Sequence, residues 1–141
     1  MIRKLEKVDI DEVMNIWLET NISTHDFIDK NYWKYHYNDV RDGILNADTY
    51  VYEENNEIVG FIGLVDGYIA GIFVKKDMQG RGIGKNLINT VKEKYKELTL
   101  NVYEKNAKAI DFYKSIGFEI IKREIDEQTK ESELFMKWIK K

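Results

Sequence analysis

Three glycines at alternate positions, Gly80, Gly82 and Gly84, join a predicted strand to a predicted helix. Apolar residues precede this loop, and apolar side chains recur at helical spacing from Ile83 to Tyr95. The first N–H groups of a helix have no internal partner and lie at the positive end of its dipole. Glycine leaves the adjacent backbone unshielded, so that an anion can approach it closely. The stretch from Phe73 to Lys85 therefore predicts an anion-binding site.

The spacing within this loop separates three kinds of anion site. A P-loop places glycine six residues before a Lys-Ser/Thr pair, but here Gln79 stands at that glycine position and Asn86 at the hydroxyl position. A dinucleotide fingerprint requires a third glycine where this chain has Lys85. The pattern that fits is Q-x-x-G-x-G, formed by Gln79, Gly82 and Gly84. It resembles the acyl-CoA pyrophosphate loop of the GNAT superfamily of N-acetyltransferases.

Length and charge limit the classes of protein to which this chain can belong. Its 141 residues are expected to form one domain, residues 1–141, with a core of its own. The formal net charge of −3 argues against non-specific binding to nucleic acid or to an anionic membrane. No apolar run approaches the ~20 residues that span a bilayer, and the N-terminus lacks a secretory signal. We therefore expect a cytoplasmic protein with no nucleic-acid or membrane partner.

The composition also excludes every role that needs a cysteine thiol. The chain has no cysteine, which excludes disulfides, thiolate nucleophiles and thiolate metal sites. Its two histidines, His25 and His36, show no metal-ligand spacing, so we expect no metal site.

Periodicity predicts strands separated by helices over the whole chain. Strands are expected at residues 1–5, 49–53, 58–64, 68–75, 98–103, 118–125 and 133–139. Helices are expected from a capping box at Asp9 and Glu12, in two pieces between residues 23 and 46, after the glycine loop, and at residues 107–116. The resulting order, β-α-α-β-β-β-α-β-α-β-β, predicts an α/β (α+β) fold with a mixed, mostly antiparallel central sheet and helices on both faces.

Local signals add detail to the middle strands. The pairs Asn55-Asn56 and Asp66-Gly67 predict tight turns. The strands beside them are almost continuously apolar, which indicates a sheet covered on both faces. Gly71, in the middle of a strand, indicates a bulge or a close backbone approach.

A second motif lies one predicted helix and one strand after the glycine loop. Asn106, Ala109, Phe112 and Tyr113 form N-x-x-A-x-x-F-Y, and Gly117-Phe118 follows three residues later. This pattern is similar to the second CoA-binding motif of the GNAT superfamily. Two motifs in the right order, within the matching order of elements, extend the resemblance over nearly the whole chain.

The resemblance implies acetyl-CoA as cosubstrate and assigns roles to individual residues. It implies that backbone amides of the glycine loop hold the CoA pyrophosphate: Gln79, Gly80, Arg81, Gly82, Ile83, Gly84 and Lys85. It implies that the pantetheine arm pairs like a strand with Ile72, Phe73 and Val74, where one N–H polarises the thioester carbonyl. Asn106 is expected to hydrogen-bond the pantetheine–phosphate region, and Ala109 and Phe112 to shape the groove.

Tyr113 is the expected general acid. Attack of an amine on a thioester expels a thiolate, and a phenol with a reference pKa of ~10 is a suitable proton donor at neutral pH. The alternative is that Tyr113 is a core aromatic, at helical spacing from Ile110.

The general base is less well defined. Many relatives carry a glutamate on the strand before the glycine loop, but residues 69–74 contain no acid. The candidates that remain are His25, with its neighbour Asp26, then Asp66 and Tyr103. His25 ranks first because the reference pKa of histidine lies near neutrality, although a surface or helix-capping role is the alternative. Deprotonation through water needs no residue at all.

These observations predict an N-acetyltransferase that moves an acetyl group from acetyl-CoA to a primary amine by direct attack in a ternary complex. The acceptor is expected to be a small-molecule or peptide amine, and residues 27–37 are expected to set its specificity. The alternatives are a non-catalytic acyl-CoA binding or sensing domain and a phosphate-binding domain for another nucleotide. The resemblance also implies that this protein can form a homodimer, although no feature of the sequence specifies one.

Overall fold

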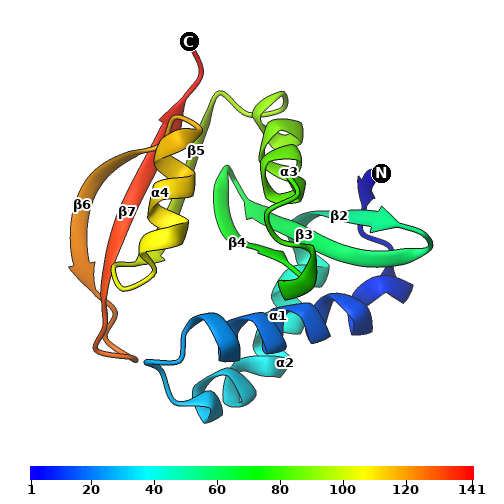
Figure 1. Ribbon diagram of the computed structural model, residues 1–141, viewed down its shortest axis with the longest axis horizontal. Coiled ribbons are helices and arrows are strands. Elements are labelled where there is room, and N and C mark those ends of the chain that lie inside the picture. Colours follow the sequence, from blue (N-terminus) through cyan, green and yellow to red (C-terminus); the bar gives the residue numbers. More distant parts are fainter.

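The computed structural model describes all 141 residues as a seven-stranded sheet flanked by four α-helices (Figure 1). The strands are β1 (Ile2–Lys4), β2 (Asp48–Glu54), β3 (Glu57–Val65), β4 (Tyr68–Val74), β5 (Glu97–Tyr103), β6 (Glu119–Ile125) and β7 (Ser132–Ile139). The helices are α1 (Ile10–Thr24), α2 (Lys30–Asn46), α3 (Ile83–Lys92) and α4 (Ala107–Ser115), with 3₁₀ turns η1 (Lys7–Asp9) and η2 (Lys76–Met78). The predicted order of strands and α-helices is confirmed.

The helices cover the two halves of the sheet differently. α1 and α2 pack on one face of β2 and β3, where Phe61 is buried, while α3 and α4 pack on the opposite face, where Ile62 is buried. Burial on both faces explains the continuous apolar sequence of β3. Over β5 and β7 only the α3–α4 face is buried, with Leu100 and Met136 inside. The predicted coverage of both faces therefore holds for the first half of the sheet alone.

Strands β4 and β5 diverge in the middle of the sheet. The spatial order is β1-β2-β3-β4-β5-β7-β6, and every neighbouring pair is antiparallel except β4 and β5. That parallel pair is in register at one position only, Tyr68 with Thr99. Beyond Tyr68, the edge of β4 that faces β5 is unpaired, and Figure 1 shows the two strands spreading apart. A sheet edge of this kind exposes backbone donors and acceptors.

The predicted turns and bulge are confirmed. Asn55 and Asn56 have φ of 53° and 63°, and Asp66 and Gly67 have φ of 50° and 82°, as two-residue hairpin turns of type I′ require. Gly63 pairs with Gly71 whereas the next residue of β3, Leu64, pairs with Ile69, which leaves one residue of β4 unpaired. The bulge therefore lies beside Gly71, next to the point where β4 leaves β5.

Two expectations about the first helices were wrong. The capping box is formed by Glu6 and Asp9 around η1, and Asp9 makes no side-chain cap for α1. The Asp9 carboxylate is instead bound by Arg3, and Glu12 accepts a hydrogen bond from the backbone N–H of Ile58. The capping box therefore lies three residues earlier than predicted, and only Glu12 is bound by a group that is distant in the sequence.

The second correction concerns residues 23–46, which do not form two separate helical pieces. α1 continues to Thr24, a turn follows, and α2 runs unbroken from Lys30 to Asn46 with Asp29 as its N-cap. Gly43 lies within α2 with open space beside it. None of the helices has the length and apolar character that crossing a membrane requires.

Candidate active site

The glycine loop ends in the N-terminus of α3 and stands open. Gly80 and Gly82 have φ of 80° and 83°, a left-handed conformation that disfavours any other residue, and no atom lies within 4 Å of where a Cβ would be on either. The first helical bond is donated by the N–H of Asn86 to the oxygen of Gly82 at 3.0 Å. The amides of residues 83–85 precede that bond and lack helical partners. The backbone therefore has the form of an anion site.

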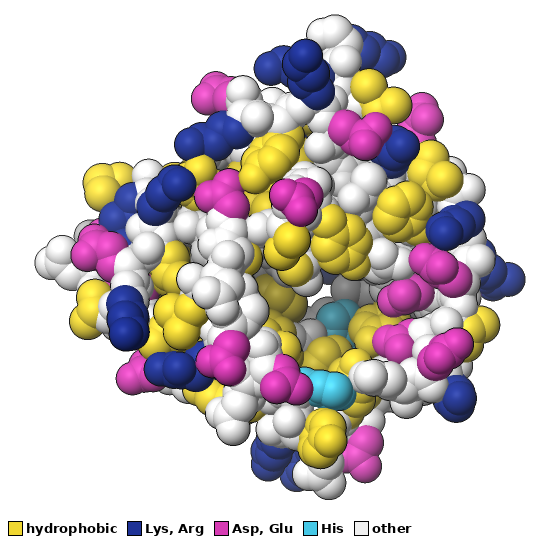
Figure 2. All heavy atoms as spheres, turned by 180° about the vertical axis from the view of Figure 1, so that it is seen from behind, with side chains coloured by type: hydrophobic (Ala, Val, Ile, Leu, Met, Phe, Trp, Pro, Cys, Tyr) yellow, Lys and Arg dark blue, Asp and Glu magenta, His cyan; other side chains and the backbone are white.

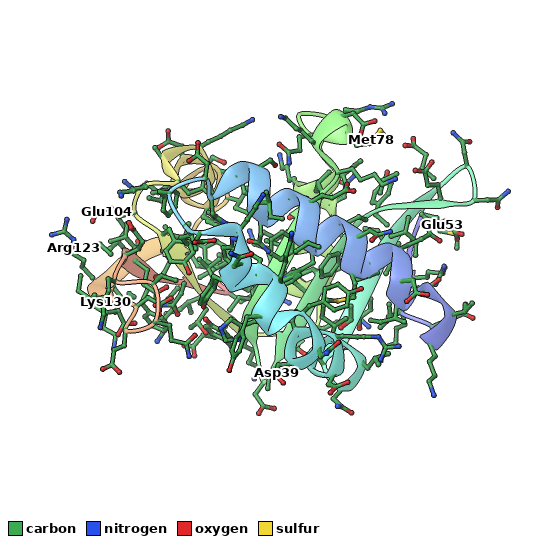
Figure 3. The ribbon with its side chains drawn as sticks, turned by 90° about the horizontal axis from the view of Figure 1, so that it is seen from below. Asp39, Glu53, Met78, Glu104, Arg123 and Lys130 are labelled. Carbon is green, nitrogen blue, oxygen red and sulfur yellow. The ribbon has the colours of Figure 1, made fainter.

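Side chains of the loop hold it to β4 and leave two cations at its surface. The Gln79 side-chain amide donates to the Val74 oxygen at 2.9 Å, which ties the loop to the end of the strand. Arg81 contacts the sulfur of Met78 and lies 3.9 Å from Glu54, with 56 % of its side chain exposed. Lys85 is also exposed. Figure 3 shows Met78 projecting from η2 on this side of the molecule.

Ile72, Phe73 and Val74 lie on the part of β4 that has left β5. On one side they pair with β3, with partners Ile62, Phe61 and Gly60. On the other side they have no strand partner, so the backbone groups of that edge face the space between β4 and β5. An extended ligand that enters there meets β4 as a further strand would.

Helix α4 closes the other side of this space. Asn106 is its N-cap, with Oδ1 accepting from the Ala109 N–H at 3.2 Å. The Phe112 ring comes within 3.5 Å of where a Cβ on Gly84 would be, so α4 packs against the glycine loop. The two motifs, 22 residues apart between Gly84 and Asn106 in the sequence, thus meet beside the divergence of β4 and β5, a region that we call the groove.

Tyr113 stands between the rings of Phe112 and of Phe118, a residue of the buried core. Its ring centroid lies 5.4 Å from that of Phe112 and 5.8 Å from that of Phe118. Burial raises the pKa of the Tyr113 phenol above its ordinary value, so the hydroxyl keeps its proton at neutral pH.

His25 follows the last residue of α1 and reaches across to α4. Its Nδ1 lies 2.9 Å from Oδ1 of Asn21, and its Nε2 lies 3.4 Å from Nδ2 of Asn106. Burial lowers the pKa of His25 to about 4, which makes the imidazole neutral and weakly basic at pH 7. The structure therefore brings His25 and Asn106 together, in contact with each other.

Carboxylates gather on the open face of β5, β6 and β7, a group that the sequence did not single out. Nδ2 of Asn101 donates to Glu124 and to Glu133, each at 3.2 Å, and the Tyr68 hydroxyl donates to Oδ1 of Asn101 at 3.1 Å. The Tyr103 hydroxyl donates to Asp126 at 3.2 Å. We call Glu124, Asp126 and Glu133 the carboxylate cluster. The clean alternation of β5 was the available signal, because it turns Asn101 and Tyr103 away from the core.

The charges of the carboxylate cluster are poorly compensated. Glu124 and Glu133 are direct partners across β6 and β7, which is an unfavourable arrangement of like charges. Burial and the nearby Asp126 and Glu124 raise the pKa of Glu133 above its ordinary value. Glu133 forms no ion pair with a cationic side chain that would lower it again. One cation, Lys122, lies 3.7 Å from Glu124.

Hydrogen bonds tie the β6–β7 hairpin to α2 on one side and to the end of β5 on the other. The Tyr32 hydroxyl donates to the Gln128 side chain at 3.3 Å, which joins α2 to the β6–β7 turn. Arg123 donates to Glu104 at 2.9 and 2.6 Å, and Figure 3 shows both near Lys130 at this end of the molecule. Of the predicted specificity segment, residues 27–37, Phe27 packs on Tyr103 at 5.7 Å whereas Trp33 is buried and Tyr35 points outward.

The remaining candidate bases lie apart or are protonated. Asp66 sits in the β3–β4 turn, near Tyr95. Burial raises the pKa of Tyr103, so its phenol is neutral. No three His, Asp or Glu side chains are arranged to hold a metal ion.

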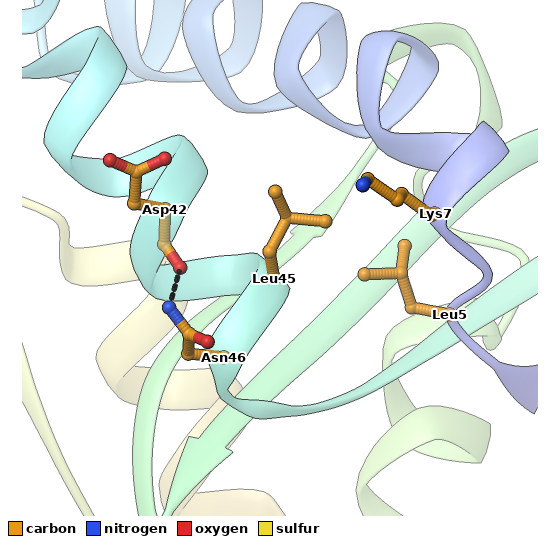
Figure 4. Close-up of a pocket in the computed structure, with 5 residues that line it drawn as sticks. All are labelled: Leu5, Lys7, Asp42, Leu45 and Asn46. Carbon is orange, nitrogen blue, oxygen red and sulfur yellow. Dashed lines mark hydrogen bonds between the residues drawn. The ribbon is translucent and has the colours of Figure 1, made fainter.

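Two hollows of the surface can be followed in the figures. Figure 2, from behind, shows one in the middle of the molecule where hydrophobic, acidic and histidine side chains meet. Figure 4 shows the other, an open pocket of about 370 Å³ between the start of the chain and the end of α2, lined by Leu5, Lys7, Asp42, Leu45 and Asn46. The second pocket shares no residue with the glycine loop, α4 or the carboxylate cluster.

Comparisons with known proteins identify the family of this chain. Residues 10–118 match the model of the acetyltransferase (GNAT) family. The peptidyl-lysine N-acetyltransferase YiaC of Escherichia coli (strain K12) is 36 % identical over 140 residues, which cover 98 % of this chain and 96 % of that protein. The peptidyl-lysine N-acetyltransferase YjaB of the same strain is 32 % identical over 128 residues, which cover 89 % of this chain and 87 % of YjaB.

Solved structures share the fold over the full chain. The solution structure of apo YjaB from Escherichia coli superposes with a TM-score of 0.86 at 28 % identity, covering 100 % of this chain and 98 % of that one. The PaiA N-acetyltransferase of Thermoplasma acidophilum, crystallised in complex with coenzyme A, gives a TM-score of 0.81 at 19 % identity and covers 99 % of this chain and 98 % of that one. Fold, motifs and relatives agree, and the chain belongs to the GNAT family of acetyltransferases.

Proposed function

We propose that residues 1–141 act as one acetyltransferase domain that moves an acetyl group from acetyl-CoA to the side-chain amine of a lysine in a peptide or protein. The observation that carries the choice of acceptor is the carboxylate cluster on the open face beside the divergence of β4 and β5. An alkylammonium is a cation with a reference pKa of ~10.4, and it would relieve the repulsion between these carboxylates. Two relatives named peptidyl-lysine N-acetyltransferases support the same acceptor class.

For acetyl-CoA, the proposed binding site is the open backbone of the glycine loop and the free edge of β4. The amides of residues 79–85 would hold the pyrophosphate, and Arg81 and Lys85 would add charge-assisted contacts. The pantetheine arm would pair with the free edge of β4 at residues 72–74, where an N–H would polarise the thioester carbonyl. Ala109 and Phe112 would form the wall of α4 beside it.

In the acceptor half, Glu133 is the group best placed to receive the ammonium. It is half-buried, it lacks a cationic partner, and it touches Asn101 on the strand that borders the opening. Loss of a proton from the ammonium to Glu133, or to water beside it, would free the amine. His25 is a poorer base in this geometry, because both ring nitrogens are engaged and its pKa is lowered to about 4.

The chemical step would then be a direct transfer. The amine forms a bond to the thioester carbon, the C–S bond breaks, and the departing thiolate takes the Tyr113 proton. The attacking nitrogen loses its second proton to solvent, and Tyr113 recovers its own, so that one proton is released overall. A ternary complex is expected because the chain offers no thiolate to carry an acyl-enzyme.

The test is to incubate the protein with acetyl-CoA and a set of peptides that differ in their amines. We expect CoA release and a lysine-linked acetyl group by mass spectrometry, with no product when the lysine is replaced by norleucine. Acetylation of α-amines alone would refute the lysine assignment while leaving acetyl transfer standing. Binding of acetyl-CoA without transfer to any amine would favour the sensing-domain alternative.

A further inference from the structure

A continuous chain of hydrogen bonds runs from α1 to α4 through His25. Nδ2 of Asn21 donates to the Trp17 oxygen at 2.9 Å, which leaves Oδ1 of Asn21 to face Nδ1 of His25. At the other end, Oδ1 of Asn106 accepts from the Ala109 N–H at 3.2 Å, which turns Nδ2 of Asn106 toward Nε2 of His25. Each asparagine is therefore fixed in orientation by a backbone group of its own helix.

The orientations of the two asparagines determine the protonation state and the tautomer of the His25 imidazole. Oδ1 of Asn21 accepts, so Nδ1 of His25 must carry the proton. Nδ2 of Asn106 donates, so Nε2 of His25 must be unprotonated. The chain of bonds is satisfied only by a neutral imidazole with its proton on Nδ1, the same charge state that burial favours. The bond to Asn106, at 3.4 Å, is the longest in the chain and is expected to part first.

The position of these hydrogen bonds in the fold indicates what they do. They span the space between the half of the sheet covered by α1 and the half covered by α4, where β4 and β5 pair at one position only. Asn106, at the end of these hydrogen bonds, is the N-cap of α4. Phe112, which packs on the glycine loop, and Tyr113 follow about two helical turns later. The His25 ring also packs on Tyr103 of β5, at 5.1 Å between centroids.

We propose that His25 is a positioning residue that holds α4, and with it Tyr113, across the opening of the active site. It acts through the hydrogen bond to Asn106 and makes no contact with the reacting atoms. This inference deepens the proposed function, because the activity it tunes is the acetyl transfer proposed above. It also gives Asn106 a partner within the protein, which a direct role of that amide in binding pantetheine would have to displace.

Two substitutions at the same position separate positioning from base catalysis. In H25N the shorter amide keeps a donor near Asn21 and loses the reach to Asn106, whereas in H25Q the longer amide places an oxygen where Nε2 stood. Neither amide takes up a proton near neutral pH. A base would therefore be lost equally in both variants, while a link to Asn106 would be lost in H25N and restored in H25Q. H36N is the matched control for the hydrogen-exchange measurement, because the His36 ring packs on Tyr32 and Tyr35, which lie on α2.

The first readout needs neither CoA nor acceptor. Hydrogen exchange at the amides of Ala109 and Ile110, followed by NMR, reports opening of the first turn of α4. We expect exchange about tenfold faster in H25N than in the wild type, with H25Q and H36N close to the wild type. Exchange in H25N at the wild-type rate would overturn the link.

The second readout is steady-state transfer to a lysine peptide. We expect kcat about tenfold lower in H25N with the acceptor KM within twofold, and kcat in H25Q within threefold of the wild type. Equal loss of kcat in H25N and H25Q would overturn positioning and assign a base. A wild-type protein that acetylates no lysine peptide would refute the proposed function, and the exchange rates would still decide the link.

Discussion

The two sides of the groove differ in the groups that they present: backbone groups on one side and side chains on the other. The glycine-loop side consists of backbone: positive φ at Gly80 and Gly82, free amides at the start of α3 and a free edge on β4. The proposed acceptor side consists of side chains that come from four separate segments, and its polar groups bind one another through Asn101 and Tyr103. A backbone site depends on local conformation, which a short motif can specify, whereas a side-chain site depends on which strands become neighbours.

This difference has a consequence for substitutions. On the backbone side most side chains can change, provided that glycine and helix start are kept. On the side-chain side, single changes of charge or of one hydrogen bond are expected to alter binding or rate with little effect on the fold. The four predictions below test that contrast, from the largest effect to the smallest.

Tyr113→Phe removes a proton donor and leaves the packing on Phe112 and Phe118 in place. We expect kcat for a lysine peptide to fall about 100-fold or more, with the Kd of CoA within twofold of the wild type, measured by steady-state kinetics and calorimetry. Tyr95→Phe, which removes a hydroxyl bonded to Asp48 far from the groove, should leave kcat unchanged. A Tyr113→Phe enzyme with the wild-type rate would mean that another group protonates the thiolate.

The lowered pKa of His25 predicts a loss of stability in acid. Above pH ~6.5 the imidazole is neutral in both states and contributes nothing. Between pH 6.5 and 4 the unfolded chain binds a proton that the folded chain, with a pKa of about 4, does not, so stability falls as the pH falls.

We expect this contribution to reach about 2 kcal/mol at pH 4, after allowance for partial exposure of the ring. Urea unfolding from pH 7 to 4 measures it as the difference between the wild type and H25Q, which has no titrating group there. Parallel pH profiles for the two proteins would show that the folded state does not exclude the His25 proton.

Gly82→Ala tests the backbone side. A side chain at φ 83° costs about 1–2 kcal/mol of conformational strain, and we expect a matching loss of stability and a weaker Kd for CoA. Gly43→Ala is the control: Gly43 lies inside α2 with open space beside it, so the same change should stabilise the protein by about 0.5–1 kcal/mol. Thermal unfolding with and without CoA measures both, and Gly82→Ala behaving like Gly43→Ala would contradict the requirement for glycine in the loop.

Glu133→Gln tests the side-chain side. If Glu133 binds the acceptor ammonium as proposed, loss of its charge should raise the acceptor KM about tenfold, equal to ~1.4 kcal/mol of binding. The free energy of unfolding should stay constant or rise slightly, because Glu124 and Asp126 lose a like-charged neighbour.

Glu97→Gln serves as the control, since Glu97 is exposed at the far end of β5 and pairs with Lys137. An unchanged KM in Glu133→Gln would remove the carboxylate cluster from the acceptor site.

Much of the architecture could be predicted because its signals are local. The hairpin turns at Asn55-Asn56 and Asp66-Gly67, the cap at Asn106 and the left-handed glycines all depend on residues a few positions apart. The capping box at Asp9 and Glu12 failed because Asp9 pairs with Glu6 instead, and because Glu12 accepts from the backbone of Ile58, 46 residues away.

The sequence by itself determined the family, the order of the elements and the glycine loop with its helix, because hydrophobic period and glycine conformation are properties of short segments. Tertiary structure decided what the polar side chains do. The pairing of β6 with β7 set Glu124 against Glu133, and the meeting of α1 with α4 bound His25 to Asn106. Those contacts join residues up to 81 positions apart in the chain, and only the folded chain brings them together.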